Sequence, residues 1–451
     1  MRATEVSVAN FFRADEIDAM ARESGFVKRR SPVTGMRFLV TFTTGLLNTP
    51  DGTLAQLAAF LGGTCGAGVS AQAVDQRTNS LAREFLARCL VAALKMAAAI
   101  RPDADEFLRV FAHLYVIDST NFSLHPALAE AFKGSGGGAS AAAMRIQFLF
   151  DYRTGTMHIQ IGDVTLSDTA ALADLVEQHS LPQDGVCLFL SDLGYFKMAT
   201  FTAIGENPDH HFLSKLQFGV RLISPDGTDL DLKGLLKSNP DQFDLPVTVG
   251  SRTCRLVGRR LPDDVVASRI RRANKASESS SRQITDQYRL FLHYALYITS
   301  LPATYTMKQL FALYRIRWQV ELTFKVWKSI LAIHRIRSAK EDRVRCEVLG
   351  KLILAVLLSF LSATTRARLD GLAVSTHKIA RHVRALATNW ALAIQMGTAR
   401  HREFLAKLSR DMARSCRKTT HKRRPALEDR LAEALAKPST YAGPADTETL
   451  G

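Results

Sequence analysis

The segment from His113 to Leu216 most constrains the fold, because its hydrophobic pattern switches repeatedly between a strand period and a helix period. Runs of branched and aromatic residues at HLYVIDST, MRIQFLF and TMHIQIG predict strands, the last two forming a hairpin turned at 153–156. A helix capped near Ser167, the strand VCLFLS, a short helix and the strand HHFLSKL follow. This order predicts an α/β fold, a mixed sheet with helices on its faces.

Helical segments are predicted in the sequence before and after the region that forms the sheet. Thr53–Leu61 and a longer periodic piece from Val69 are separated by a glycine-rich turn, which resembles a helix-turn-helix; a plain helical bundle explains the same pattern. We predict a helical N-terminal DNA-binding domain over residues 1–105. The α/β domain follows in two parts, 106–216 and 289–345, which are separated by a β-rich insertion over 217–288. C-terminal helices with a dimerisation role are predicted over 346–410, and a basic flexible tail over 411–451.

The charge balance indicates the kind of partner. Lys and Arg number 59 against 43 Asp and Glu, a net charge of +16, which predicts a polyanionic partner, nucleic acid before an anionic membrane surface. The six cysteines are scattered singly, which argues against a zinc site or disulfides. The N-terminus carries acidic residues early, and the apolar run Leu352–Leu361 is too short for a bilayer. We therefore expect a soluble intracellular protein.

Two aspartates share one context. Asp118 in YVIDST and Asp192 in LFLSDLGY each end an apolar strand. If these strands are neighbours, both side chains emerge at the carboxyl edge of the sheet, where two hard oxygen ligands suit Mg²⁺ and a third carboxylate allows a second ion. A strand-terminal Asp is more often a cap or turn residue, and we keep that interpretation for Asp151, Asp163 and Asp168.

A strongly helical segment supplies a third carboxylate. Leu313–Ile330 is predicted as part of one long helix beginning at Thr306, with one face on the core. The simplest interpretation is an amphipathic helix with an Arg–Glu pair at i, i+4. Its polar residues share one narrow sector: Tyr314, Arg317, Glu321 and Lys328. Its apolar residues occupy the next sector: Leu313, Ile316, Val320, Phe324, Trp327 and Ile330.

The spacing Tyr314-x2-Arg317-x3-Glu321-x6-Lys328 resembles the Y-R-E-K signature of bacterial insertion-sequence transposases of the DDE type, specifically the insertion-sequence-four family. DSTNF at residue 118, SDLGYF at residue 192 and the β-rich insertion support the resemblance, which covers residues 110–340 well. It implies an RNase H-like catalytic domain in which three residues are catalytic and bind two Mg²⁺ ions, with Mn²⁺ as a substitute: Asp118, Asp192 and Glu321.

The resemblance also implies DNA contacts. Tyr314, Arg317 and Lys328 correspond to residues that contact transposon-end phosphates, and Trp318 lies where relatives carry a Trp near the active-site DNA, with core packing as its alternative. Lys215, in HHFLSKL, stands where the family often has Arg.

Two further segments bear on DNA contact. The basic run with Arg271 and Arg272 is either a solvated helix or a phosphate-contacting surface. Relatives that form a DNA hairpin stack a flipped base on a Trp before the strand-to-helix turn, where this chain offers Tyr294 or Tyr297.

The resemblance implies a transposase that binds the inverted-repeat ends of its own element as a homodimer in a synaptic complex. It would cleave the ends and join them to double-stranded target DNA in the bacterial cytoplasm, at the nucleoid, with no membrane partner. Two alternatives stay open: a catalytically inactive or domesticated DNA-binding protein, and an RNase H-like nuclease without strand transfer.

Overall fold

The computed structural model describes residues 8–66, 68–98, 106–136, 140–177, 181, 184–280, 283–369 and 374–418. Most of the predicted basic tail and part of the glycine-rich run 134–144 lie outside the described residues. The chain forms two compact units. The first unit comprises Met1–Ala104, Ser119–Ser167 and Trp318–Ala426, and the second comprises Asp105–Asp118, Asp168–Arg317 and Leu427–Gly451.

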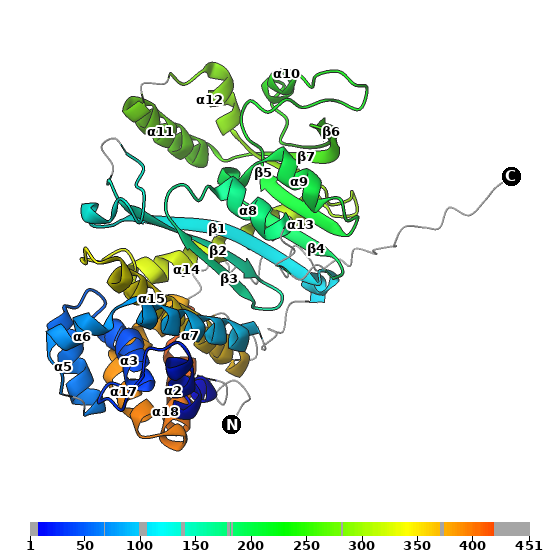
Figure 1. Ribbon diagram of the computed structural model, residues 1–451. Helices are drawn as coiled ribbons and strands as arrows, with labels where there is room; N and C mark the ends of the chain where they lie inside the picture. Colours follow the sequence, from blue (N-terminus) through cyan, green and yellow to red (C-terminus); the bar gives the residue numbers. More distant parts are fainter. Residues whose placement is uncertain are drawn as a thin grey trace. The chain divides into compact units, whose positions relative to one another are not determined.

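Eight strands form a mixed sheet in the order β3-β2-β1-β4-β5-β8-β7-β6 (Figure 1). Strand β1 pairs parallel with β4, and β4 with β5, whereas β2–β3, β5–β8, β8–β7 and β7–β6 pair antiparallel. The order β3-β2-β1-β4-β5 is that of an RNase H-like fold, so the predicted fold class is confirmed. The strands are β1 (His113–Ser123), β2 (Ala143–Asp151), β3 (Met157–Gly162), β4 (Cys187–Ser191), β5 (His210–Lys215), β6 (Gln242–Val249), β7 (Arg252–Arg260) and β8 (Tyr294–Thr299).

In the second unit, apolar strands form the core. The paired residues Tyr115 of β1 and Phe189 of β4 are buried, and Phe201 stacks on Phe212 of β5 with ring centroids 4.3 Å apart. The helices here are α8 (Asp168–Glu177), α9 (Met198–Ile204), α10 (Leu232–Lys237), α11 (Asp263–Ser280), α12 (Asp286–Leu292) and α13 (Met307–Arg315).

Two local predictions in the second unit differ from the structure. The piece VRLIS forms only isolated bridges from Ile223, to Asp229 and Thr248, instead of a strand. The piece LFLHYAL divides between the end of α12 and the start of β8, with His293 between them. Both pieces are too short for periodicity to separate strand from helix.

Helices from both ends of the chain pack together in the first unit, as the blue and orange ribbons of Figure 1 show. Thr53 starts α5 through a capping box with Gln56, and Gly66, at φ 62°, ends it. The helices are α2 (Ala14–Glu23), α3 (Gly35–Val40), the π-helix η1 (Thr41–Gly45), α4 (Leu46–Asn48), α5 (Leu54–Cys65), α6 (Ala71–Arg77), α7 (Ser80–Ala98), α14 (Trp318–Ser329), α15 (Glu341–Arg368), α16 (Thr376–Ala385), α17 (Ala387–Gln395) and α18 (Thr398–Ser415).

The periodic piece predicted from Val69 is two helices. Helix α6 ends at Arg77, and the side chain of Asn79 accepts the backbone N–H groups of Leu81 and Ala82, both at 3.1 Å. That geometry caps a new helix, so α7 starts at Ser80. DNA binding by this N-terminal region remains a prediction.

Helix α15 is the buried centre of the first unit. The run Leu352–Leu361 is buried as predicted, within a 28-residue helix that is long and apolar enough to cross a membrane by length and composition. However, 89% of its most apolar window is buried inside the protein. Gly350 allows close packing here, because a Cβ would lie 2.0 Å from the carbonyl oxygen of Phe42 in η1.

The prediction of one unbroken helix from Thr306 to Ile330 is wrong. The capping box of Thr306 starts α13 as expected, but the chain turns at residues 316–317, and α14 begins at Trp318. The N–H groups of Ile316 and Arg317 bond back only three residues, at 3.0 and 3.2 Å, which makes a tight turn. The predicted apolar face is nonetheless buried throughout: Leu313, Ile316, Val320, Phe324, Trp327 and Ile330.

Candidate active site

The structure brings Asp118 and Asp192 together, but only Asp192 follows the end of its strand, because β1 continues past Asp118 to Ser123. Val116 pairs with Leu190 in the parallel ladder of β1 and β4, so the two aspartates, each two residues further on, occupy equivalent positions. Arg317 Nη1 lies 3.1 Å from Asp118 Oδ2 and 3.9 Å from Asp192 Oδ2. One guanidinium nitrogen therefore serves both carboxylates.

Two more side chains hold Asp192. Lys215, at the end of the parallel neighbour β5, donates from Nζ to Asp192 Oδ1 at 2.9 Å. The buried Tyr314 hydroxyl donates to the carbonyl oxygen of Ser191 at 3.1 Å and lies 3.3 Å from Asp192 Oδ1. Lys215 Nζ and Arg317 Cζ lie 5.9 and 5.8 Å from the Tyr314 ring centroid, within the range of cation–π contact. We call Asp118, Asp192, Lys215, Tyr314 and Arg317 the carboxylate cluster.

The charges in the carboxylate cluster keep Asp192 ionised. Burial pushes the pKa of Asp192 upward, but the nearby charges of Arg317 and Lys215 outweigh it, and the pKa is lowered overall. Burial, followed by the Asp192 charge, raises the pKa of Tyr314, so this side chain stays a neutral phenol that donates a hydrogen bond.

The other signature residues lie on α14, in the first unit. Glu321 occupies its first turn, and Lys328 is exposed near its end. Trp327 anchors the helix on Phe148 of β2, with ring centroids 5.2 Å apart. Trp318 is 57% exposed, which excludes core packing as its role.

A complete metal site is not assembled in the part of the chain that the structure describes. There, no three His, Cys, Asp or Glu side chains gather closely enough to hold an ion. The set of Asp118, Asp192 and Glu321 therefore stays a prediction, of which the structure brings the first two together.

The basic run on α11 divides by role. Arg269 donates from Nη1 to the carbonyl oxygens of Tyr294 and Leu292, at 2.8 and 3.4 Å, and so supports the start of β8. Arg271 and Arg272 are exposed. Only these last two were predicted as DNA contacts, and they face solvent.

The aspartates assigned to turns behave differently from Asp118 and Asp192. Asp151 accepts the backbone N–H of Arg153 at 2.9 Å, and Asp163 accepts that of Thr165 at 2.8 Å. Both bonds reach two residues along the chain, as Asx-turns do.

Two tyrosines take packing roles that the sequence did not indicate. Tyr294 is buried, and Tyr297 packs on Phe311 and Tyr314, with ring centroids 5.0 and 4.5 Å apart. The two residues are three positions apart on β8 and so face opposite sides of the sheet, and every residue of this strand except Tyr297 is buried. Tyr297 therefore helps to hold the ring of Tyr314 in place.

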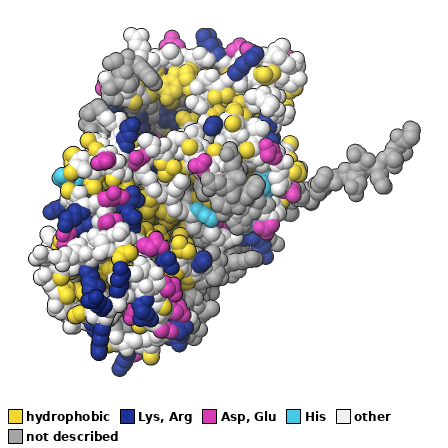
Figure 2. All heavy atoms as spheres, viewed as in Figure 1, with side chains coloured by type: hydrophobic (Ala, Val, Ile, Leu, Met, Phe, Trp, Pro, Cys, Tyr) yellow, Lys and Arg dark blue, Asp and Glu magenta, His cyan; other side chains and the backbone are white. Residues whose placement is uncertain are grey.

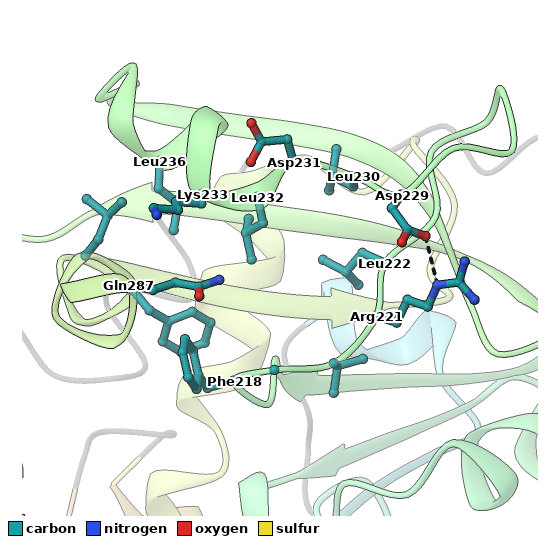
Figure 3. Close-up of a pocket in the computed structure, with 14 residues that line it drawn as sticks. Phe218, Arg221, Leu222, Asp229, Leu230, Asp231, Leu232, Lys233, Leu236 and Gln287 are labelled. Atoms are coloured by element: carbon teal, nitrogen blue, oxygen red, sulfur yellow. Dashed lines mark hydrogen bonds and ion pairs between the residues drawn. The ribbon is translucent and has the colours of Figure 1, made fainter. Parts of the chain in front are cut away.

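A separate cavity of about 240 Å³ lies within the second unit (Figure 3). Apolar side chains such as Phe218, Leu222 and Leu232 line it, and an ion pair between Arg221 Nε and Asp229 Oδ1, at 2.8 Å, stands at one end. Figure 2 shows hydrophobic side chains gathered in the region of α11 and α12. The cavity contains no carboxylates held by shared cations, so the carboxylate cluster is the better candidate for the active site.

An RNase H-like sheet with two carboxylates at adjoining strand positions, in a strongly basic chain, defines a class of enzymes that act on the phosphodiester bonds of nucleic acids. The family described as Transposase DDE domain matches residues 111–357, just over half of the chain. The chain therefore belongs to the DDE transposases, as its resemblance predicted, and it acts in DNA transposition.

Two curated proteins similar to this chain are bacterial insertion-sequence transposases. The chain is 27% identical over 388 residues to the transposase for insertion sequence element IS1151 of Clostridium perfringens, covering 80% of each chain. It is 24% identical over 388 residues to the transposase for IS231C of Bacillus thuringiensis subsp. berliner, covering 80% of this chain and 79% of that one. A piggyBac transposase synaptic complex with hairpin DNA aligns at a TM-score of 0.48 and 11% identity, covering 98% of this chain and 87% of that one.

Proposed function

We propose that this transposase cleaves DNA at the inverted-repeat ends of its element and joins them to target DNA, using divalent metal ions held by Asp118, Asp192 and Glu321. The observation that carries the proposal is the convergence of the first two carboxylates on a single cationic nitrogen, Arg317 Nη1. Two carboxylates that lie close enough to share the charge of one guanidinium also lie close enough to share a metal ion.

The chemistry of these residues fits Mg²⁺, with Mn²⁺ as a substitute. Mg²⁺ in proteins is commonly held by one or two carboxylates completed by water and substrate phosphate. The lowered pKa of Asp192 supplies an ionised ligand at neutral pH. Glu321 adds the third carboxylate, enough for two ions. When bound, such ions assist the attacking oxygen and stabilise the leaving oxygen of a phosphodiester.

The chain's own residues divide into two groups. The Tyr314 hydroxyl, which lies within reach of both the Ser191 carbonyl oxygen and Asp192 Oδ1, orients Asp192, while Lys215 and Arg317 balance the charge of the carboxylates. We assign Tyr314 and Arg317 to the DNA strand near the cut as well, as the signature implies, and we add Lys215 because it stands where the family often has Arg. Exposed side chains provide further contacts to DNA: Trp318, Lys328, Arg271 and Arg272.

The partners follow from this role. Two element ends must be held together for transposition, so we assign a homodimer to the synaptic complex, acting in the bacterial cytoplasm at the nucleoid. The net charge of +16 supports long contacts with double-stranded DNA, both at the inverted repeats and at the target.

A plasmid that carries the inverted repeats flanking the gene tests this proposal. Asp118→Asn, Asp192→Asn and Glu321→Gln are each expected to abolish Mg²⁺-dependent nicking while end binding in a gel shift persists. Asp163→Asn is the matched control, because Asn retains an Asx-turn. Normal nicking by any of the three variants would refute the metal-ligand assignment. Nicks that are never joined to a target would indicate a nuclease, and binding without nicks an inactive DNA-binding protein.

A further inference from the structure

The guanidinium of Arg317 occupies the place between the two carboxylates. Its side chain is only 8% exposed, whereas those of Asp118 and Asp192 are 20% and 35% exposed. Its Nη1 lies 3.1 and 3.9 Å from their oxygens, the position that a shared cation takes. A divalent ion between the same oxygens would meet the positive charge of Arg317 at close range, and the mutual repulsion opposes joint occupancy.

The position of Arg317 in the chain bears on whether its side chain can move. It lies in the two-residue turn between α13 and α14, not within a helix. Asp192 would keep two contacts after such a departure, because Lys215 Nζ and the Tyr314 hydroxyl lie 2.9 and 3.3 Å from its Oδ1. The carboxylate would therefore stay oriented while its third partner is exchanged.

We propose that Arg317 is the counter-ion of Asp118 and Asp192 in the metal-free transposase, that metal binding displaces it, and that the displaced guanidinium binds a phosphate of the DNA end. This inference rests on the proposed metal site. In this proposal, metal ions and DNA both bind more tightly to the state in which Arg317 has left the carboxylates. By linkage, each ligand then strengthens binding of the other by the same factor. The transposase would thus load metal poorly until an end is present.

Binding of Mn²⁺ alone to the DNA-free protein, followed by the electron paramagnetic resonance signal of free Mn²⁺, tests the displacement. Arg317→Ala removes the competing cation and is expected to tighten Mn²⁺ binding about tenfold, the effect of freeing a site that is available for about a tenth of the time. Arg317→Gln, which retains amide donors for the carboxylates, is expected to act in the same direction. Arg317→Lys keeps the charge and should stay near the wild-type affinity.

The matched control is Arg221→Ala, which removes one Arg from an exposed Arg–Asp pair in the same unit. It is expected to leave Mn²⁺ affinity unchanged. Circular dichroism and thermal melting establish that each variant is folded, and Arg317→Gln replaces Arg317→Ala if the latter does not fold. Unchanged or weaker Mn²⁺ binding in the folded neutral variants would overturn the inference.

A second measurement tests the coupling to DNA, with Ca²⁺ in place of Mg²⁺ so that DNA is not cut. Wild-type affinity for an inverted-repeat end is expected to rise on adding Ca²⁺, and Arg317→Ala to abolish most of that rise. The two proposals fail in different ways. Mn²⁺ binding that Asp192→Asn leaves intact contradicts the metal site itself, whereas Mn²⁺ binding that needs Asp192 but ignores Arg317 contradicts only the displacement.

Discussion

Two groups of opposite charges in this protein differ in burial. In the carboxylate cluster, Asp192 is 35% exposed and Lys215 37%. In the first unit, a second group lies along α15: Arg343 Nε contacts Glu347 Oε1 at 3.0 Å, and the Lys351 ammonium donates to the carbonyl oxygen of Ala332 at 2.9 Å. The Glu347 side chain is only 7% exposed, and Lys351 is fully buried.

Because the two groups differ in burial, the pKa shifts of their carboxylates have opposite directions. Burial raises the pKa of Glu347 and lowers that of Lys351 to about 8, although each has charged neighbours. The pKa of Asp192 is lowered, because there the two cations outweigh burial. The carboxylate cluster thus holds ionised groups at an accessible edge, where cations exchange. The α15 group instead fixes the loop after α14, where Ala332 adopts a left-handed φ of 46°.

The largest expected difference between the two groups is in the nicking rate, after one carboxylate in each group is replaced by its amide. Asp192→Asn should lower the Mg²⁺-dependent nicking rate at least about 10³-fold, or about 4 kcal/mol in barrier, because a proposed metal ligand loses its charge. Glu347→Gln should leave nicking per folded molecule within about twofold. Single-turnover nicking with matched folded concentrations measures both. Equal losses in the two variants would remove the functional distinction between the groups.

Lys351→Ala is expected to cost about 3 kcal/mol of unfolding free energy, since it leaves a cavity and deprives the Ala332 carbonyl of its donor. Urea unfolding followed by circular dichroism measures the change. The folded variant should still bind inverted-repeat DNA. A loss below about 0.5 kcal/mol would show that the α15 group does not hold the loop.

The buried His401 extends the comparison to pH. His401 accepts a hydrogen bond from Trp390 Nε1 at 2.8 Å, and burial lowers its pKa to about 3. Below pH 6.5 the unfolded chain protonates this residue while the native state does not. Stability is therefore full above that pH and falls as pH drops toward 3, by up to about 1.4 kcal/mol per unit.

His401→Gln, which keeps an acceptor for Trp390, should flatten this part of the stability curve. Denaturant unfolding at pH 7.0, 6.0 and 5.0 for both proteins provides the measurement. Parallel curves would mean that His401 is protonated in the native state as readily as in the unfolded chain.

The smallest effect on stability is expected at the exposed tryptophan. Trp318→Ala should change the unfolding free energy by less than about 0.5 kcal/mol and weaken end binding several-fold, because the ring faces solvent and directly follows Arg317 in the sequence. Trp327→Ala, on the buried face of the same helix, should cost about 3 to 5 kcal/mol. Fluorescence anisotropy with labelled ends compares their DNA affinities. Full end binding by Trp318→Ala would remove Trp318 from the DNA contacts.

Most of the strands were predictable from local pattern. The strands that contain Asp118 and precede Asp192 lie where the sequence indicates, although β1 continues past Asp118 to Ser123, and the capping box at Thr306 starts its helix at the expected residue. These features depend on side-chain alternation and on hydrogen bonds within a few residues. The break at Arg317 was not predictable, because the apolar period continues through it without interruption.

The sequence by itself therefore determined most of the strand and helix types, the family, and which carboxylates and cations the family resemblance singles out. Tertiary structure alone decided how those groups pair. Helical spacing places Arg317 four residues before Glu321, but only the tertiary structure shows that Arg317 Nη1 lies within ion-pair distance of both Asp118 and Asp192. The physical reason is that ion pairing depends on the direction of side chains, and a two-residue turn changes that direction without changing the hydrophobic pattern.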